Sequence, residues 1–217
     1  MDPRPAATVV VARPAERGVE VLILRRSASS RFAPGFLVFP GGVVEERDAA
    51  LAVRLFGRAE EAPRACAVRE LYEETSLLLT RGGLEPHPDR PPLEGGAFEP
   101  PALEDVVEIA RWVAPESLAE RFDAIFYAVA APRGLDPVPD RVEADDAWWA
   151  DPEEVVVEST RGESPLMWPT LITLERLASV SSVEEVLSMR IEQLEPGLEE
   201  RPARVRGAWR RPEGRRP

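Results

Sequence analysis

The sequence predicts an α/β fold in which a mixed β-sheet is sandwiched between α-helices. Short apolar runs bounded by turn residues recur in both halves of the chain, and such runs are typical of buried strands. A long segment rich in helix-forming residues follows the first runs, and further helix candidates follow the later ones. This alternation of strands and helices along one chain favours a sheet covered by helices on both faces.

The first strands are expected at residues 8–12 and 19–24, on either side of the turn-like sequence RPAERG. A third short strand, FLVF, runs into Pro40-Gly41-Gly42. Residues 49–56 (AALAVRLF) are helical in composition, and Gly57 is expected to end that helix.

The strongest helix prediction covers residues 63–79, because Pro63 suits the first turn and Arg81-Gly82-Gly83 follows the end. Residues 81–101 hold four Gly and six Pro and are predicted to form a long loop. Residues 121–130 (RFDAIFYAVA) are a strand candidate, with a helix as the alternative, because short apolar runs are ambiguous.

The remaining elements follow in order. EADDAWWA is a predicted strand, and the helix after it is expected to have Asp151 as its N-cap and Pro152 at its first position. Two more helices are predicted at 165–178 and 182–190. Composition does not change before residue 195, so we expect one domain over 1–195 and an Arg-rich tail over 196–217.

Composition excludes several kinds of chemistry. The 217 residues contain one Cys, one His and no Lys, so Cys-based metal sites, His-rich zinc sites and Schiff-base chemistry are all absent. The net charge of −12 argues against nucleic acid as the main partner. No apolar run is long enough to span a membrane and no signal peptide is apparent, so we expect a cytoplasmic protein.

Carboxylates carry the chemistry that remains. Glu70, Glu73 and Glu74 stand at i, i+3 and i+4 of the predicted helix, so they share one face. Three like charges on one face repel one another unless a cation offsets them, and hard oxygen donors suit Mg²⁺ or Mn²⁺. Arg69 adjoins the cluster and can pair with Glu73. Taken alone, the same pattern also occurs on solvated helices.

The order FPGG…RELYEETS resembles the Nudix hydrolases, whose box reads Gly, five residues, Glu, seven residues, Arg-Glu-apolar-x-Glu-Glu-x-Gly-apolar. The resemblance places these box positions in the chain: Gly42, Asp48, Arg69, Glu70, Leu71, Glu73, Glu74 and Leu77. There are three departures. Asp48 replaces a Glu, Ser76 replaces a Gly, and 13 additional residues separate Asp48 from Arg69, which we interpret as an insertion at 49–61 outside the core sheet.

The interrupted box, with LRRSASSRFAPGFLVFPGG before it, is similar to the peroxisomal coenzyme A diphosphatase type and its bacterial relatives. This resemblance implies a Nudix fold and a diphosphatase that acts on a nucleoside diphosphate-linked small molecule, with coenzyme A or an acyl derivative as the favoured substrate. A dinucleotide such as ADP-ribose or NADH is the alternative substrate. A Nudix module that binds nucleotides without cleaving them is an alternative function, and a homodimer is compatible with either.

The resemblance also implies roles for individual residues. Glu70, Glu73 and Glu74 would hold the cation, the backbone at Gly42 would contact the metal or a phosphate, and Arg69 would orient the glutamates. The proton of the attacking water would pass to Glu70 or, as the first choice, to Glu143. Substrate phosphates would meet three arginines that precede FPGG: Arg25, Arg26 and Arg31.

Overall fold

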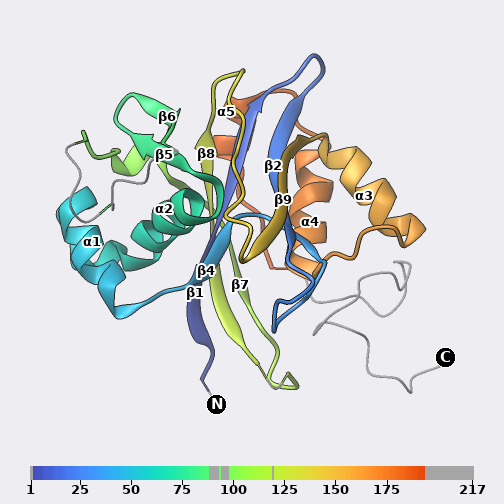
Figure 1. Cartoon of the computed structure of the whole chain (residues 1–217), viewed down its shortest axis with the longest axis horizontal. Helices are drawn as coiled ribbons and strands as arrows, with labels where there is room; N and C mark the ends of the chain where they lie inside the picture. The colour runs from blue at the N-terminus through green and yellow to red at the C-terminus, as the bar shows by residue number, and fades with distance from the viewer. Residues whose placement is uncertain (1, 88–92, 94–97, 119, 194–217) are drawn as a thin grey trace.

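The computed structural model describes residues 2–87, 93, 98–118 and 120–193. A seven-stranded sheet lies between two layers: α1, α2 and a small hairpin on one face, and α3, α4 and α5 on the other (Figure 1). The strands of the sheet are β1 (Arg4–Pro14), β2 (Val19–Arg26), β3 (Leu37–Val38), β4 (Gly41–Val43), β7 (Val107–Val113), β8 (Phe122–Ala130) and β9 (Ala144–Ala150). The predicted sandwich of helices around a sheet is confirmed.

The sheet is mixed because β1 pairs in parallel with β8, whereas its other pairings are antiparallel. Its strand order is β3-β2-β1-β8-β7, with β4 added to β1 and β9 added to β2. The opposite edge of β1 is shared by two partners: Ala6–Thr8 pair with β4, and Ala12–Pro14 pair with β2. The Gly-Gly turn is therefore built into the sheet as a short strand, which the sequence did not predict.

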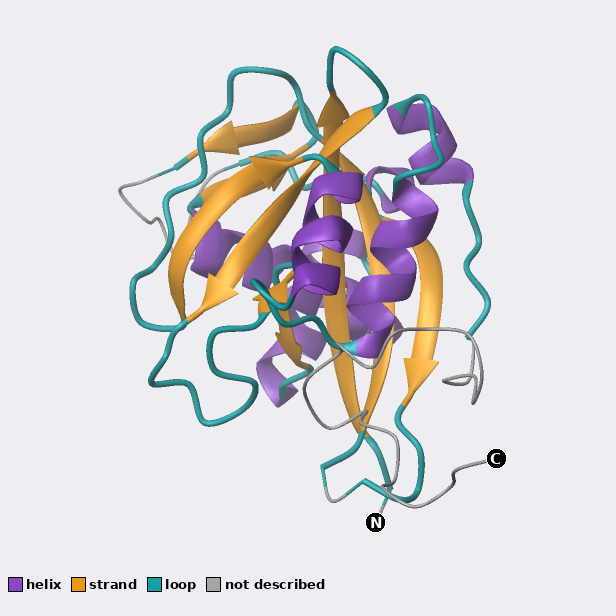
Figure 2. Cartoon of the chain, turned by 90° about the vertical axis from the view of Figure 1, so that its right-hand side faces the viewer, coloured by secondary structure: helices purple, strands orange, loops and turns teal. Residues whose placement is uncertain are grey.

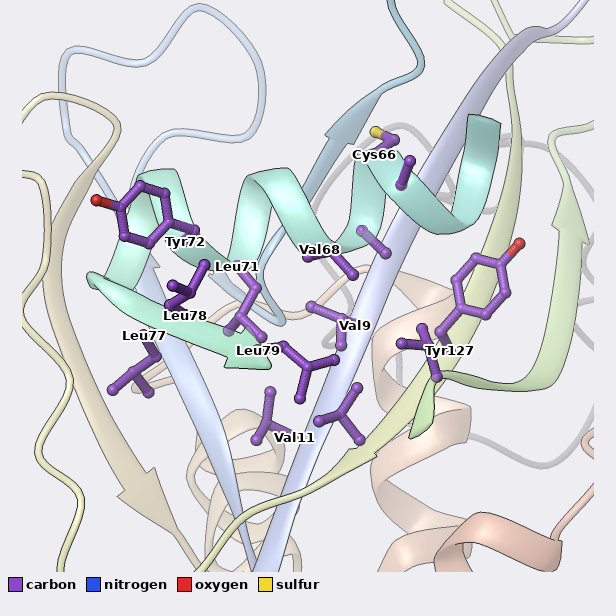
Figure 3. Packing of buried hydrophobic residues seen from close by; sticks show 14 of the residues in the cluster. Val9, Val11, Cys66, Val68, Leu71, Tyr72, Leu77, Leu78, Leu79 and Tyr127 are labelled. Atoms are coloured by element: carbon purple, nitrogen blue, oxygen red, sulfur yellow. The ribbon is translucent and has the colours of Figure 1, made fainter. Parts of the chain in front are cut away.

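Helix α2 (Ala62–Thr75) crosses one face of the sheet. Its Val68 and Leu71 point toward Val9 and Val11 of β1 and are buried there (Figure 3). Burying side chains of this size contributes about 1.5–3 kcal/mol each, so this apolar side fixes the rotation of the helix. The side that carries the glutamates consequently faces β4.

The insertion forms helix α1 (Glu46–Phe56) and a single 3₁₀ turn at Ala59–Glu61, outside the sheet as expected. The helix starts three residues earlier than predicted and ends at Gly57, whose left-handed φ of 75° suits glycine. Leu51 and Leu55 are buried in the cluster beneath α2. The insertion is therefore part of the hydrophobic core.

The predicted helix at 63–79 is too long, because α2 ends at Thr75. Ser76 adopts a left-handed φ of 57°, and the following Leu77–Thr80 form strand β5. This strand pairs with β6 (Gly83–Pro86), so the predicted loop at 81–101 begins with a hairpin turn. Part of that range, 88–92 and 94–97, lies outside the described residues. The three consecutive leucines fit a buried strand as well as a helix, and the left-handed Ser76 decides between them.

The second helical layer covers the other face of the sheet (Figure 2). It contains α3 (Pro152–Arg161), α4 (Trp168–Leu177) and α5 (Val183–Ser188). The predicted cap is present, because the Asp151 side chain accepts a hydrogen bond from the Glu153 N–H at 2.8 Å. Residues 121–130 adopt the strand alternative as β8, whereas β7 was not predicted.

Among the described residues, no helix combines the length and apolar character needed to cross a bilayer. The Arg-rich tail at 196–217 lies outside the described residues.

Replacing Ser76 with Gly is expected to stabilise the protein by about 0.5–1 kcal/mol, because glycine adopts the left-handed conformation without a Cβ penalty. Urea unfolding measures the difference. The reciprocal control is Gly57→Ala, which should destabilise by about 1 kcal/mol or more at the left-handed end of α1. Equal stabilities for Ser76→Gly and the parent would contradict the assigned backbone strain.

Candidate metal and catalytic site

The glycine turn and the glutamate face of α2 are in direct contact. The Gly41 N–H donates a hydrogen bond to Glu74 Oε2 at 2.9 Å. A Cβ atom at Gly42 would lie 2.1 Å from Glu70 Oε1, and one at Gly41 would lie 2.5 Å from the carbonyl oxygen of Ala7. Both distances are far below van der Waals contact. A side chain at Gly41 would push the turn away from the backbone of β1, and one at Gly42 would displace the Glu70 carboxylate from its present position.

Arg69 lies at the centre of the carboxylate cluster and is 4% exposed. Its Nε and Nη2 donate to the two carboxylate oxygens of Asp48 at 2.7 and 3.0 Å. Its Nη1 donates to Glu70 Oε1 at 2.7 Å and to Glu73 Oε2 at 2.8 Å. One guanidinium thus restrains three carboxylates, which is the arrangement that an orienting role would require.

Asp48 belongs to this network although 20 residues separate it from Arg69 in the sequence. Its side chain is fully buried in the first turn of α1, where it also accepts the Glu45 N–H at 2.8 Å. The inserted residues follow Asp48, and the chain comes back to Asp48 at Arg69. The length of the insertion therefore does not move Asp48 out of the carboxylate cluster. A spacing argument could not show this, because the return path is a tertiary feature.

Burial sets the electrostatics of the two innermost glutamates. It raises the pKa of Glu70 to about 7, against the attraction of Arg69, and repulsion from Glu73 and Glu143 acts in the same direction as burial. Burial also raises the pKa of Glu74 well above its usual range, with further repulsion from Glu70 and Glu143. The site therefore concentrates negative charge that its own arginines do not fully offset.

The donor set fits a divalent cation in its chemistry. Glu70, Glu73 and Glu74 supply hard carboxylate oxygens. A cation would offset the burial, and the smaller mutual repulsion, that raise the pKa values of Glu70 and Glu74. Within the described residues, however, no three acidic, His or Cys side chains already converge as a metal site. The Glu70 and Glu73 carboxylates both accept hydrogen bonds from Arg69 Nη1, so the structure supports the donor chemistry without fixing a coordination geometry.

Glu143 approaches the same cluster from the segment before β9. Its side chain is exposed, and its charge acts on both Glu70 and Glu74. Its backbone carbonyl accepts the Ser27 N–H at 2.8 Å, which ties it to the end of β2. The charge of Glu143 thus acts on the buried glutamates of α2, and its role as proton acceptor stays a prediction.

The three predicted phosphate-binding arginines do not share one environment. Arg26 is the one whose charge acts on Glu74, while its Nε donates to the Phe32 carbonyl at 3.1 Å. The Arg25 guanidinium lies 5.7 Å from the ring centre of Trp148, and Arg31 is exposed. The charge of Arg26 thus acts on a site carboxylate, and contact of Arg25, Arg26 and Arg31 with a phosphate stays a prediction.

Two features of the site were not predicted from sequence. One is the hydrogen bond from the Gly41 N–H to Glu74, while the predicted contact of the Gly42 backbone with a metal or phosphate stays a prediction. The other is the position of Cys66, which is fully buried and has its Sγ 3.4 Å from Arg69 Nη2. The Gly41 contact joins two elements, and the sequence carries no signal for it, whereas Cys66 and Arg69 stand at i and i+3 of α2.

Two of the clefts on the described chain lie away from the glutamates of α2. One of about 470 Å³ is walled by the end of α1, Arg81 and residues 99–103, and therefore includes part of the predicted 81–101 loop. The other, of about 770 Å³, follows β7 and residues 190–192. The glutamates of α2 line neither of these two clefts.

Comparison with known proteins gives consistent matches. The family model described as the NUDIX domain matches residues 2–168. A Caenorhabditis elegans protein named nudix hydrolase 7 is 29% identical over 192 residues, which cover 82% of this chain and 61% of that protein. The chain thus spans less than two thirds of the length of this relative.

Two further matches extend over most of the chain. Human acyl-coenzyme A diphosphatase NUDT19 is 24% identical over 254 aligned residues, covering 86% of this chain and 68% of the human protein. The crystal structure of a NUDIX hydrolase from Alicyclobacillus acidocaldarius superposes with a TM-score of 0.73 at 29% identity, covering 88% of this chain and 98% of that one.

The buried charge of Glu74 gives a test of the electrostatics in the metal-free protein. Its folded pKa lies above the unfolded value, so the protonated form favours folding at low pH and this advantage is lost as pH rises through the folded pKa. Glu74→Gln should therefore raise the free energy of unfolding in EDTA by about 1–3 kcal/mol at pH 8 and by less at pH 5.

Urea titrations at the two pH values measure this effect. Glu73→Gln is the matched control, because its side chain is 40% exposed and pays little burial penalty. A Glu74→Gln protein that is less stable than the parent at both pH values would show that the carboxylate is not under electrostatic strain.

Proposed function

The chain belongs to the Nudix family, and on that premise we propose that it is a metal-dependent hydrolase that cleaves the diphosphate linkage of a nucleoside diphosphate derivative. The observation that carries the proposal is the pair of buried glutamates, Glu70 and Glu74, held against the Gly41-Gly42 turn. Burial of two repelling carboxylates disfavours the folded protein, and a divalent cation and its diphosphate ligand would offset that disadvantage.

The proposed metal ligands are Glu70, Glu73 and Glu74, with the backbone at Gly42 as a further contact to the metal or a phosphate. Mg²⁺ or Mn²⁺, when bound, supplies positive charge against the diphosphate oxygens and the negative charge that develops on them. Arg69 orients the glutamates, because each of the hydrogen bonds from its Nη1 fixes the direction of one carboxylate.

A carboxylate must accept the proton of the attacking water, and Glu143 is our first choice for this role. Its side chain is exposed to solvent beside the cluster, whereas Oε1 of Glu70 already accepts a hydrogen bond from Arg69. Glu70 is the alternative base, since its pKa of about 7 is well matched to proton transfer near neutral pH.

Coenzyme A or an acyl derivative is the proposed substrate. Support comes from the similarity to the human protein named acyl-coenzyme A diphosphatase, which extends over 86% of this chain. Arg26, with Arg25 and Arg31, would meet the phosphates of the substrate on a protein whose overall charge of −12 repels anions. The expected products are 3′,5′-ADP and 4′-phosphopantetheine or its acyl form, with any thioester intact.

Glu73→Gln tests the hydrolase proposal. The substitution should lower kcat by about 100-fold or more with little change in stability, because it removes a metal ligand at a partly exposed position. Steady-state kinetics with Mg²⁺ and Mn²⁺, together with urea unfolding, measure both quantities. Glu154→Gln, an equivalent substitution on the exposed face of α3, is the control that should leave both unchanged. Normal turnover by Glu73→Gln would reject the site.

A substrate panel tests the finer proposal. Coenzyme A, an acyl-coenzyme A, ADP-ribose and NADH are compared at equal metal concentration, and the products are identified by mass. We expect the highest kcat/KM for coenzyme A or its acyl form. If ADP-ribose is cleaved at least tenfold more efficiently, the coenzyme A assignment fails, while the diphosphatase proposal survives.

A further inference from the structure

The connection between β8 and β9, residues 131–143, is fastened to the rest of the molecule along its length; we call it the connecting arm. Near its start, the Leu135 carbonyl accepts the indole N–H of Trp149 at 2.6 Å. The same carbonyl accepts a hydrogen bond from Arg13 Nη1 at 3.4 Å, and the Arg13 guanidinium lies 4.4 Å from the Trp149 ring centre. This stretch of the arm is thus tied to both β1 and β9.

The middle of the arm contacts the glutamate helix itself. The Val138 N–H donates to the Thr75 carbonyl at 2.8 Å, one residue after Glu74. Carbonyls in the last turn of a helix lack partners within the helix, so this bond satisfies one of them. The arm is therefore positioned by the same helix end that carries Glu74.

The end of the arm is organised by one side chain, Asp140. Its Oδ1 accepts the N–H groups of Val142, Glu143 and Ala144 at 3.1, 3.0 and 3.1 Å. Arg141 between them adopts a left-handed φ of 65°. Three successive amides that point to one oxygen fix the backbone through Glu143, and the Ser27 N–H holds the Glu143 carbonyl at 2.8 Å.

We propose that Asp140 is a positioning residue that directs the Glu143 carboxylate toward Glu70 and Glu74 by gathering the backbone N–H groups of residues 142–144. The inference rests on the proposed function, in which Glu143 accepts the proton of the attacking water. Asp140 acts through the backbone of the arm and takes no part in the chemistry itself. A catalytic group displaced by about 1 Å can lose up to about 100-fold in rate, so loss of this restraint should be measurable.

The geometry separates a positioning role from a role for the negative charge. Oδ1 accepts all three N–H groups, whereas Oδ2 accepts only a second and longer bond from the Glu143 N–H at 3.2 Å. The asparagine side chain keeps an oxygen that can take the place of Oδ1. Asp140→Asn should therefore retain the restraint without the charge, whereas Asp140→Ala removes both. Asp136→Ala is the matched control, because Asp136 is an exposed aspartate of the same arm with no hydrogen-bond partner among the described residues.

The experiment compares steady-state kinetics of the full-length variants on the best substrate of the panel. We expect Asp140→Ala to lower kcat about tenfold while KM changes less than about threefold, and Asp140→Asn and Asp136→Ala to stay within about threefold of the parent. In a Glu143→Gln background, Asp140→Ala should cause no further loss, because the group that it positions is already absent.

Three kinetic outcomes would overturn the inference: an unchanged kcat for Asp140→Ala, equal impairment of Asp140→Asn and Asp140→Ala, or additive losses in the double variant. Amide hydrogen exchange at residues 142–144 provides a readout that needs no activity, and protection should be lost in Asp140→Ala alone. If the unsubstituted protein cleaves no diphosphate, the proposed function fails. Amide hydrogen exchange at residues 142–144 then still shows whether Asp140 holds the connecting arm. If exchange is unaffected, the positioning claim fails.

Discussion

The structure depends on the buried guanidinium of Arg69. It joins Asp48 at the start of the inserted helix to Glu70 and Glu73 on α2, so two elements from distant parts of the chain share one ion-pair network. Removing the fully buried partner Asp48 would cost about 3–5 kcal/mol, because the Arg69 charge would stay buried with less compensation, whereas Glu73 is partly exposed. Two kinds of contact therefore anchor helix α1: Leu51 and Leu55 pack in the hydrophobic core, and Asp48 pairs with Arg69 in the carboxylate cluster.

One side of helix α2 packs against the sheet, and another side carries the glutamates of the proposed site. Its apolar side is locked on β1 through Val68 and Leu71, and this leaves its carboxylate side no freedom to rotate away from the Gly41-Gly42 turn. The close approach that the glycines permit is what buries Glu70 and Glu74. The repulsion between the two carboxylates lowers the stability of the folded protein. It persists because the packing of α2 against the core fixes the position of the helix.

The connecting arm adds a third contribution from a region far from the box in sequence. It reaches the end of α2 through Val138 and the end of β2 through Glu143, so one loop links the two elements that border the carboxylate cluster. Loops that carry functional groups gain precision when their backbone is restrained by a rigid scaffold. Here the restraint combines one helix-end carbonyl, one strand-end amide and the side chain of Asp140.

Features that depend only on residues nearby in the sequence could be predicted without the structure. These are the common face of Glu70, Glu73 and Glu74, the Asp151 cap, the end of α1 at Gly57 and most of the strands. Only the folded chain shows that Leu77–Thr80 form a strand and that β4 and β7 join the sheet. The same holds for the charge of Arg26 acting on Glu74 and for the position of Arg25 near the Trp148 ring. The tertiary structure also brought Asp48 back to Arg69 across the insertion. The physical reason is that helical periodicity and capping are local, whereas strand pairing and buried ion pairs join residues whose separation in sequence carries no information about their distance in space.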